Sequence, residues 1–432
     1  MAFALGLFLF AALANADLQQ ESGLDEKEQD EFALGKSFFT TPWIEAPSAT
    51  TARDGLGPLF NANACVSCHP NNGRGSIYNK NYSVSRAYVT RLSIPSNGSM
   101  EHKNAQKYVG FVQEETYGGQ ISVNGVHGVA FEAKPVIAYK KIAITYPDGS
   151  RATLRQPLKG VKNRLRDLRY GKLNADAIIT NRLAPALVGL GLLERLTDEQ
   201  ILKNQDVQDE DGDGVSGKAN MVYSPLHKDF RVGRYSYKAS APSLLHQIAF
   251  AANNDMGLTN PLFPKENCTK NQKECLAAPK GADLFDLPMK RLEAISFYLS
   301  NLKLPKSTIT QKKGEKLFSS IGCVKCHAPS FILEDGYEIK PFTDMLLHDM
   351  GEGLSDGREE FEATPREWRT PALWGLGKYK LASGPELLHD ARAKTVEEAI
   401  LWHGGEARKI KDDFMNLSRE NRERIINYVK EL

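Results

Sequence analysis

The most apolar stretch of the chain lies at its start, and the remainder alternates short apolar runs with polar ones. Residues 3–14 carry no charge, and the small residues Ala14 and Ala16 follow directly before Asp17. A run of this length is too short to span a bilayer, and the small-residue pattern after it is typical of a cleaved export signal. We therefore predict a signal peptide over residues 1–16, although no Lys or Arg precedes the apolar run.

An N-terminal anchor that is never cleaved is the alternative interpretation of this segment. In either case we expect the body of the chain outside the cytoplasm, in the periplasm or otherwise exported. No later segment is apolar enough for a membrane helix, so we expect no membrane span after signal removal.

Two amphipathic segments with similar sequences divide the rest of the chain. Residues 291–302 and 424–432 both place apolar side chains at helical spacing. In the second segment, Ile425, Val429 and Leu432 fall on one helical face, and Ser418 is a suitable N-cap. Residues 304–306, which contain a proline, are typical of a linker. We therefore expect one domain over residues 17–305 and a second over residues 306–432.

The longer first unit contains patterns of two kinds. Residues 135–139 and 141–146 are β-like runs, and a Pro-Asp-Gly turn follows them at residues 147–149. Residues 185–196 form an apolar stretch that we interpret as helical. These patterns predict a large inserted region with a minor β element.

Composition and charge exclude several classes of protein. The 432 residues suffice for two or three domains, and 41% hydrophobic with 25% charged residues is ordinary for a folded soluble chain. The formal net charge of +2 is too balanced to indicate nucleic acid as a partner.

Two copies of a C-x-x-C-H pattern carry the clearest chemistry. They consist of Cys65, Cys68 and His69, and of Cys323, Cys326 and His327. Two thiols on one turn can add to the two vinyl groups of a haem, and the adjacent histidine then reaches the iron. A redox dithiol or half of a zinc site is the alternative, since C-x-x-C alone suits both. Two copies in an exported chain favour two covalent c-type haems, with the two histidines as proximal ligands.

The two motifs indicate the fold class. A phenylalanine stands five residues before the first cysteine of each motif, at Phe60 and Phe318, and each unit ends in one of the amphipathic segments. We therefore predict a mainly α fold with two cytochrome c-like domains, the first with a large inserted region containing minor β structure.

Two further features concern cysteine and metal chemistry. Cys268 and Cys275 enclose a polar loop, and we expect them to form a disulfide in an oxidising compartment, with two free thiols as the alternative. Asp209, Asp211 and Asp213 match the front half of a calcium loop. Position twelve is an asparagine rather than glutamate, and a tight acidic turn without metal is an equal alternative.

Longer stretches of the sequence resemble the di-haem oxidoreductase (putative peroxidase) family, relatives of bacterial di-haem cytochrome c peroxidases. The resemblance runs over nearly the whole mature chain and rests on residues 52–62, 73–75, 182–194, 241–246, 347–357, 368–377 and 388–392. It implies an enzyme in which one haem takes in electrons, from a small donor such as a cytochrome c or a cupredoxin, and the other reacts with hydrogen peroxide. Residues 234–239 depart from the family, which tends to have a Gly-Trp pair there, so Tyr237 would have to serve as any aromatic group between the haems.

The resemblance also bears on the N-terminal haem. Related peroxidases often place a removable histidine ligand soon after the first motif, and residues 70–101 contain no histidine. We therefore expect this haem to be open and to react with peroxide, which needs a vacant iron position and acid–base help. Glu194 and Gln120 are the candidate catalytic groups, with ordinary packing or solvent exposure as the alternative for each.

The C-terminal haem has a candidate sixth ligand in His403. Thr395 and Glu398 match a capping box, and Gly404 suits a helix end, so His403 is predicted in the last turn of a helix. Related peroxidases bring a methionine or a tyrosine to this position, and we predict His403 opposite the second proximal histidine. A helix-end histidine favoured by the dipole is the alternative. The rival ligands are His348, Met350 and His389.

The sequence therefore favours a peroxidase-like di-haem oxidoreductase. Two alternatives stay open at this point. One is a di-haem electron carrier whose irons are both six-coordinate. The other is a thiol oxidoreductase that uses Cys268 and Cys275.

Overall fold

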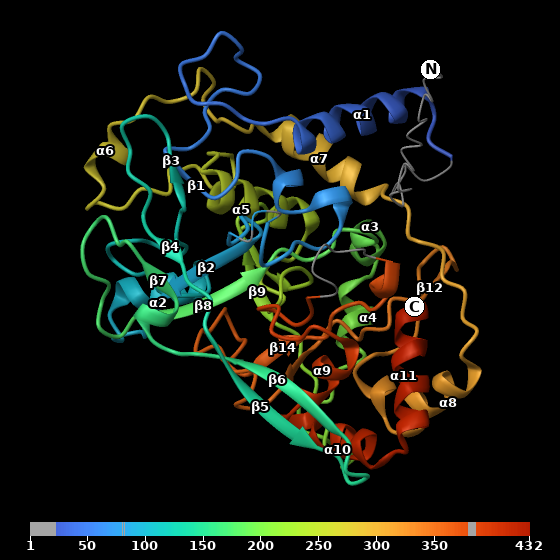
Figure 1. Ribbon diagram of the computed structural model, residues 1–432. Coiled ribbons are helices and arrows are strands. Elements are labelled where there is room, and N and C mark those ends of the chain that lie inside the picture. The colour runs from blue at the N-terminus through green and yellow to red at the C-terminus, as the bar shows by residue number, and fades with distance from the viewer. Residues whose placement is uncertain (1–22, 80, 82, 379–385) are drawn as a thin grey trace, which may run out of the picture.

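The computed structural model describes residues 23–79, 81, 83–378 and 386–432 (Figure 1). The predicted signal peptide over residues 1–16 lies outside these residues. Across the described part of the chain, no helix combines the length and apolar character needed to cross a membrane.

Helices occur along the whole described chain. The α-helices are α1 (Glu26–Thr40), α2 (Met100–Tyr108), α3 (Leu190–Glu194), α4 (Asp198–Leu202), α5 (Leu244–Met256), α6 (Lys273–Leu276), α7 (Met289–Ser300), α8 (Lys312–Ser320), α9 (Val396–Leu401), α10 (Arg408–Asn416) and α11 (Arg419–Glu431).

Within the described residues the strands pair only in twos, and all of these pairs are antiparallel. They are β1 (Leu59–Phe60) with β3 (Asn124–Gly125), β2 (Tyr88–Ser93) with β8 (Ile178–Leu183), β4 (Lys134–Pro135) with β7 (Leu165–Arg166), β5 (Tyr139–Thr145) with β6 (Arg151–Pro157), β9 (Met221–Ser224) with β10 (Asp229–Val232), β11 (Phe331–Ile332) with β12 (Glu338–Ile339), and β13 (Leu347–Asp349) with β14 (Glu367–Arg369).

The prediction of a mainly α fold with two cytochrome c-like domains is wrong. Within the described residues, fourteen strands accompany eleven helices, and α3, α4 and α6 span five residues or fewer. The pairing of β2 with β8 sets Tyr88 opposite Leu183. No local pattern in the sequence predicts a pairing between two segments so far apart in the chain. The helix expected over residues 185–196 is reduced to α3, because Gly189 adopts a left-handed φ of 75° and begins the helix only there.

Two helix pairs form the framework around the motifs. α1 packs along α7, and α8 packs along α11 (Figure 1). Both crossings need a glycine: a Cβ on Gly35 would lie 1.9 Å from the carbonyl oxygen of Ala294, and one on Gly314 would lie 2.3 Å from that of Arg424. This close approach lets each pair hold the segment that carries its C-x-x-C-H motif.

The β5–β6 hairpin reaches from the middle of the chain to the C-terminal helices (Figure 1). The hydroxyl of Tyr146 donates to a carboxylate oxygen of Glu397 at 2.7 Å, and Arg422 donates to Asp148 at 2.8 Å. Tyr146 and Leu154 belong to the same buried cluster as the helices around the second motif. Residues before position 305 therefore help to build the core of the C-terminal part.

Candidate functional site

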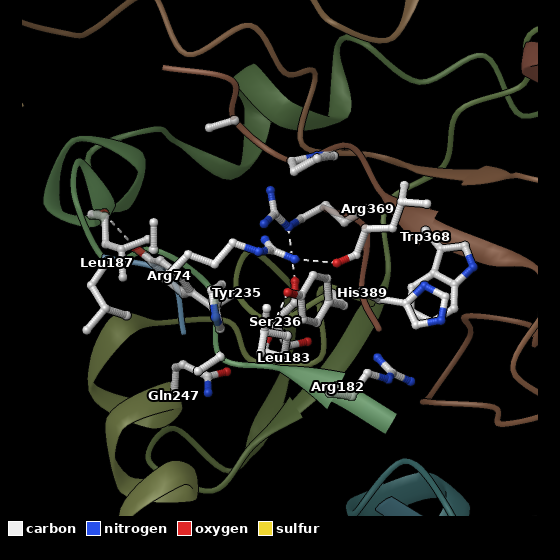
Figure 2. A pocket seen from close by; sticks show the side chains of 18 of the residues that line it. Arg74, Arg182, Leu183, Leu187, Tyr235, Ser236, Gln247, Trp368, Arg369 and His389 are labelled. Atoms are coloured by element: carbon white, nitrogen blue, oxygen red, sulfur yellow. Dashed lines mark hydrogen bonds between the residues drawn. The ribbon is translucent and has the colours of Figure 1, made fainter. Parts of the chain in front are cut away.

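A single cavity of about 480 Å³ reaches both C-x-x-C-H motifs. The cysteines and histidines of the two motifs line it together with side chains from β2, α5 and the segment after α9. Figure 2 shows part of this lining, where arginine side chains and a stacked pair of rings face the space. A cavity of this size suits a small molecule or cofactor.

Each motif forms the same short turn. Cys65–Ser67 and Cys323–Lys325 are 3-10 helices, and the backbone N–H of the motif histidine donates to the carbonyl of the first cysteine at 3.0 Å in both. None of the four motif cysteines is in a disulfide. Burial raises the pKa of Cys65 and of Cys323 to about 12. These thiols are therefore protonated at neutral pH and are poor redox nucleophiles.

Three histidines that line the cavity are held in the same way. In His69, His327 and His403 the Nδ1 atom lies next to a backbone carbonyl oxygen. The distance is 2.8 Å from His69 to Pro185, 2.9 Å from His327 to Phe342, and 2.8 Å from His403 to Ala399. A carbonyl only accepts, so Nδ1 must carry the proton and Nε2 keeps its lone pair. A hydrogen bond of this kind is the usual support of a metal-bound imidazole.

Burial also keeps these imidazoles neutral. It lowers the pKa of His69 and of His327 to about 4, and it lowers the pKa of His403 as well. His403 lies close enough to His327 to contribute to the lowered pKa of the latter. A neutral imidazole is the form that binds a metal ion. The structure therefore brings the two histidines predicted for the second haem to the same part of the cavity.

The helix before His403 begins as predicted, with one difference. The Thr395 side chain accepts from the backbone N–H of Glu398 at 3.0 Å. The Glu398 carboxylate, however, accepts from the N–H of Lys394 at 2.8 Å, so the reciprocal half of the capping box is displaced by one residue. The helix α9 ends at Leu401 with Trp402 as its C-cap, so His403 lies just past the helix and not in its last turn as predicted.

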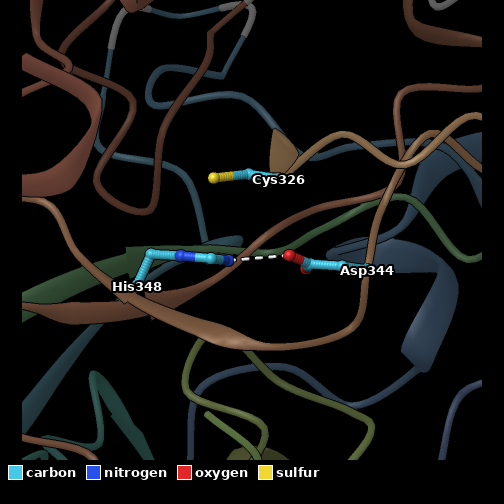
Figure 3. Close-up of side chains that lie close together, drawn as sticks. All are labelled: Cys326, Asp344 and His348. Carbon is cyan, nitrogen blue, oxygen red and sulfur yellow. Dashed lines mark hydrogen bonds and ion pairs between the residues drawn. The ribbon is translucent and has the colours of Figure 1, made fainter. Parts of the chain in front are cut away.

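The rival ligand His348 is held in another way (Figure 3). Its Nδ1 lies 2.7 Å from Glu406 and its Nε2 lies 2.7 Å from Asp344. Burial opposes charging of this imidazole, but hydrogen bonds to Asp344, Cys326 and Glu406 raise its pKa well above the usual value. A protonated imidazole has no lone pair for a metal. The ligand atoms of Cys326, Asp344 and His348 nevertheless lie within 4.8 Å of one another.

The other rivals, His389 and Met350, also line the cavity. His389 stacks flat on Trp368, with ring centroids 3.8 Å apart and an interplanar angle of 8° (Figure 2). Arg182 and Lys238 lie 4.6 and 4.2 Å from the Trp368 ring. Tyr237, the expected aromatic group between the haems, lines the same cavity, and its ring centroid lies 6.5 Å from that of His389.

The wall beside the first motif carries polar groups that sequence reasoning missed. From β2, Arg91 faces the cavity, and from α5, Gln247 and Asp255 do so. Burial raises the pKa of Asp255, whereas the nearby charge of Arg91 and a hydrogen bond from Gln120 oppose this shift. The Nε2 of Gln120 donates to the Asp255 carboxylate at 2.7 Å. Gln120 therefore acts on the cavity through Asp255, because it does not line the cavity itself.

Glu194, the other predicted catalytic residue, does not line the cavity either. Its carboxylate accepts from the Tyr235 hydroxyl at 2.5 Å and from the backbone N–H of Leu244 at 3.0 Å. These contacts hold the beginning of α5 and explain the position of Glu194 without a catalytic role.

The acidic loop gathers a different set of carboxylates from the one predicted. Asp206, Asp209 and Asp211 each place one carboxylate oxygen within 4.8 Å of the others. Asp213 instead pairs with Lys325 at 2.8 Å. Lys325 stands between the two cysteines of the second motif, so the loop is tied to that motif.

Cys268 and Cys275 form the expected disulfide, with their sulfurs 2.00 Å apart. Neither cysteine lines the cavity, and both pack in a separate cluster with Leu59, Val126 and Val129. The disulfide therefore closes its own loop apart from the two motifs.

Two cavity arginines, Arg74 and Arg369, were also missed. The available signals were the position of Arg74 shortly after the first motif and that of Arg369 within the Trp-Arg-Thr-Pro segment at residues 368–371. Neither signal shows that both side chains reach one cavity, which only the fold decides.

Comparison with known proteins supports one assignment. The family described as "Di-haem oxidoreductase, putative peroxidase" matches residues 14–432. No curated protein matches the chain. Among solved structures, the chain is similar to a hydrazine synthase from Kuenenia stuttgartiensis that was pressurized with 20 bar xenon. The two sequences are 14% identical, the alignment covers 100% of each chain, and the TM-score is 0.34. A TM-score this low does not establish a shared fold, whereas the family match spans nearly the whole chain. With two C-x-x-C-H motifs on one cavity and this match, the protein belongs to the di-haem oxidoreductase family, and its expected cofactors are haems.

Proposed function

We propose that this protein is an exported di-haem c-type peroxidase that reduces hydrogen peroxide with electrons from a small redox protein. The observation that carries the proposal is the shared cavity. Both C-x-x-C-H motifs open onto it, and each motif histidine keeps its Nε2 lone pair because Nδ1 donates to a carbonyl.

The residues present fit covalently attached haem. The four motif thiols are free of disulfides although Cys268 and Cys275 are paired. The cavity is lined mainly by apolar side chains, which suits a porphyrin ring. In this proposal Cys65, Cys68, Cys323 and Cys326 form the thioethers, and His69 and His327 are the proximal ligands.

The two centres differ in what faces the cavity beside them. At the second motif, His403 supplies a neutral imidazole, which we propose as the sixth ligand. At the first motif, the cavity-facing side chains of β2 and α5 include no histidine. Met256 of α5 does face the cavity, but its sulfur lies 4.0 Å from the Cys65 sulfur, at the edge where the haem would be attached. We therefore assign peroxide binding to the first centre and electron entry to the second.

The groups beside the first centre suit proton transfer. Reduction of one hydrogen peroxide to two waters consumes two electrons and two protons. When bound, the haem iron supplies the redox chemistry of this reaction. Asp255 takes the proton of the incoming peroxide as its carboxylate, Gln120 orients that carboxylate, and Arg91 stabilises negative charge on the same wall.

The expected electron donor and location enter the proposal unchanged, and the calcium site enters it with Asp206 in place of Asp213. The electron donor is a small cytochrome c or a cupredoxin, and the protein acts in the periplasm or otherwise outside the cytoplasm. Calcium binds the acidic loop, with Asp206 joining Asp209 and Asp211, whose carboxylates lie together. The ion pair between Asp213 and Lys325 ties this loop to the second motif.

The test is a peroxide titration of the purified protein, followed by absorbance and mass spectrometry. The expected protein mass includes two haems that resist acid–acetone extraction, and the ferric spectrum shows one high-spin haem that responds to stoichiometric peroxide. Two low-spin haems that are inert to peroxide would make the protein an electron carrier instead. As a control, a variant with Cys268→Ser and Cys275→Ser should keep its peroxide reactivity, whereas loss of reactivity would favour a thiol oxidoreductase.

A further inference from the structure

Arg74 and Arg369 face the cavity without a carboxylate partner (Figure 2). Among the described residues, no carboxylate lies within ion-pair distance of either guanidinium. Arg91 also lines the cavity, and burial lowers its pKa, but it lies close enough to Asp255 for that carboxylate to oppose the shift. Several buried arginines are paired instead, as in Arg182–Asp356, Arg358–Glu360 and Arg392–Asp390.

Both guanidiniums are fixed by backbone carbonyls. Arg74 donates from Nε to the carbonyl of Glu386 and from Nη2 to that of Leu388. Arg369 donates from Nε to the carbonyl of Ser236 at 3.2 Å and from Nη1 to that of Thr370 at 2.9 Å. These bonds leave Nη1 of Arg74 and Nη2 of Arg369 without a hydrogen bond to the described residues.

Carbonyl dipoles orient these groups, and the more distant Asp344 favours the charge of Arg369, but no described carboxylate forms an ion pair with either group. Burial lowers the pKa of Arg369 to about 10, so its guanidinium is still charged at neutral pH. An unpaired charge inside a protein is costly unless an anion accompanies it. The cavity therefore offers two oriented cations to an anionic group of its ligand.

We propose that Arg74 and Arg369 bind propionate carboxylates of the haems, an inference that rests on the proposed di-haem function. Propionates are the only ionised substituents of a haem, and the planar fork of a guanidinium matches a carboxylate. The remainder of the ring is apolar, as is most of the cavity lining. Both arginines are positioning residues. Arg74 also links the segment after the first motif to residues 386–388.

This assignment has an electrochemical consequence. A cation beside a haem favours the ferrous over the ferric state, because the ferric state carries one more positive charge. Removing either cation should shift the ferric–ferrous equilibrium of the haem that it contacts by about tenfold toward the ferric state. For a one-electron couple, this shift lowers the reduction potential of that haem by about 59 mV.

The experiment measures both haem potentials of the holoprotein by spectroelectrochemistry. The variants are Arg74→Gln and Arg369→Gln, with Arg74→Lys and Arg369→Lys as charge-preserving partners. The matched control is Arg155→Gln, because Arg155 also donates to two carbonyls, those of Arg392 at 3.0 Å and Ala391 at 2.9 Å, but does not line the cavity. We expect the Gln variants to lower one potential by about 59 mV, and the Lys variants and the control to stay near the wild-type values.

Potentials of the Gln variants that equal the wild-type values, in protein that keeps two haems, would overturn the inference. The wild type supplies a second test if the Gln variants do not accumulate. Paired propionates have a lowered pKa, so both potentials should be flat between about pH 6 and 8, and a slope that approaches 59 mV per pH unit would overturn the inference.

A separate titration distinguishes haem propionates from a free carboxylate ligand. We expect the wild-type potentials to be independent of added acetate, whereas a saturable shift that requires Arg74 or Arg369 would reject the haem assignment. These measurements need no peroxide turnover. A protein that holds two haems but is inert to peroxide would therefore refute the proposed peroxidase and still allow the arginine assignment to be judged.

Discussion

Replacing Asp255 by asparagine tests the proton-transfer role assigned to the first centre. Asparagine has nearly the same shape and can still accept the hydrogen bond from Gln120, which is 2.7 Å long in the native protein. It cannot take up a proton from peroxide. The substitution therefore removes the chemistry of the group and preserves its packing.

The expected loss depends on whether another acidic group, among the described residues that line the cavity, can replace Asp255. Glu360 also lines the cavity, but its carboxylate lies 3.3 Å from Arg182 and 3.1 Å from Arg358. Burial opposes ionisation of Glu360, yet these arginines keep its pKa below the usual value, so it is a poor proton acceptor. With no substitute for Asp255, we expect the peroxide reaction to slow by about 10²–10⁴-fold, the usual contribution of a general base. That loss corresponds to a barrier higher by about 3–5 kcal/mol.

The assay is stopped-flow absorbance at the first haem, with the second-order rate constant for peroxide measured across a range of pH. Because the carboxylate is the active form, the wild-type rate should rise as pH increases through the raised pKa of Asp255. The Asp255→Asn variant should lose this rise. Gln120→Leu removes a hydrogen bond that lowers the pKa of Asp255, so its profile should shift to higher pH.

The matched control is Glu194→Gln, which also converts a carboxylate to an amide but lies off the cavity. Its rate constant should stay within about threefold of the wild type, far below the loss expected from removing a general base. The reasoning is refuted if Asp255→Asn keeps both the wild-type rate and the wild-type pH profile while the protein holds two haems.

Three further predictions concern other parts of the molecule. His403→Ala should convert the C-terminal haem from low-spin to high-spin. His403→Met should keep this haem low-spin and raise its reduction potential, because methionine ligation raises haem potentials. An unchanged spectrum and potential in both variants would show that another residue is the sixth ligand. If Asp206, Asp209 and Asp211 hold calcium, exhaustive chelation should lower the melting temperature by roughly 1 °C for each kcal/mol of lost binding free energy in a chain of 432 residues, and an unchanged value with no calcium by elemental analysis removes the ion. His348→Gln should cost about 3–5 kcal/mol in urea unfolding near pH 6, because it breaks a buried charge pair. The pKa of His348 is higher in the folded state than the unfolded value near 6.5, so its stabilisation is complete below that pH and is lost as pH rises through the folded pKa; a difference between wild type and variant that grows with pH contradicts this assignment.

The sequence by itself determined the features that depend on near neighbours in the chain. Spacing alone sets two cysteines and a histidine on one turn, and the structure has that turn at both motifs. The disulfide between Cys268 and Cys275 closes a loop of a few residues and was predictable for the same reason. The start of α9 follows from a local cap, although the helix ends at Leu401 and leaves His403 outside it. The family resemblance is likewise a property of the sequence, and the match over residues 14–432 confirms it.

Only the tertiary structure decided which of these groups meet. Asp255 and Gln120 are 135 residues apart, and Arg74 contacts carbonyls more than 300 residues further along the chain. His348 was one of the rivals to His403 until the fold set it between two carboxylates, one of them 58 residues away. The mixed architecture was missed for the same reason, since β2 pairs with a strand some 90 residues later. Local spacing fixes chemistry within one turn, but contacts between distant segments depend on how whole surfaces pack, and no short pattern of residue types encodes that.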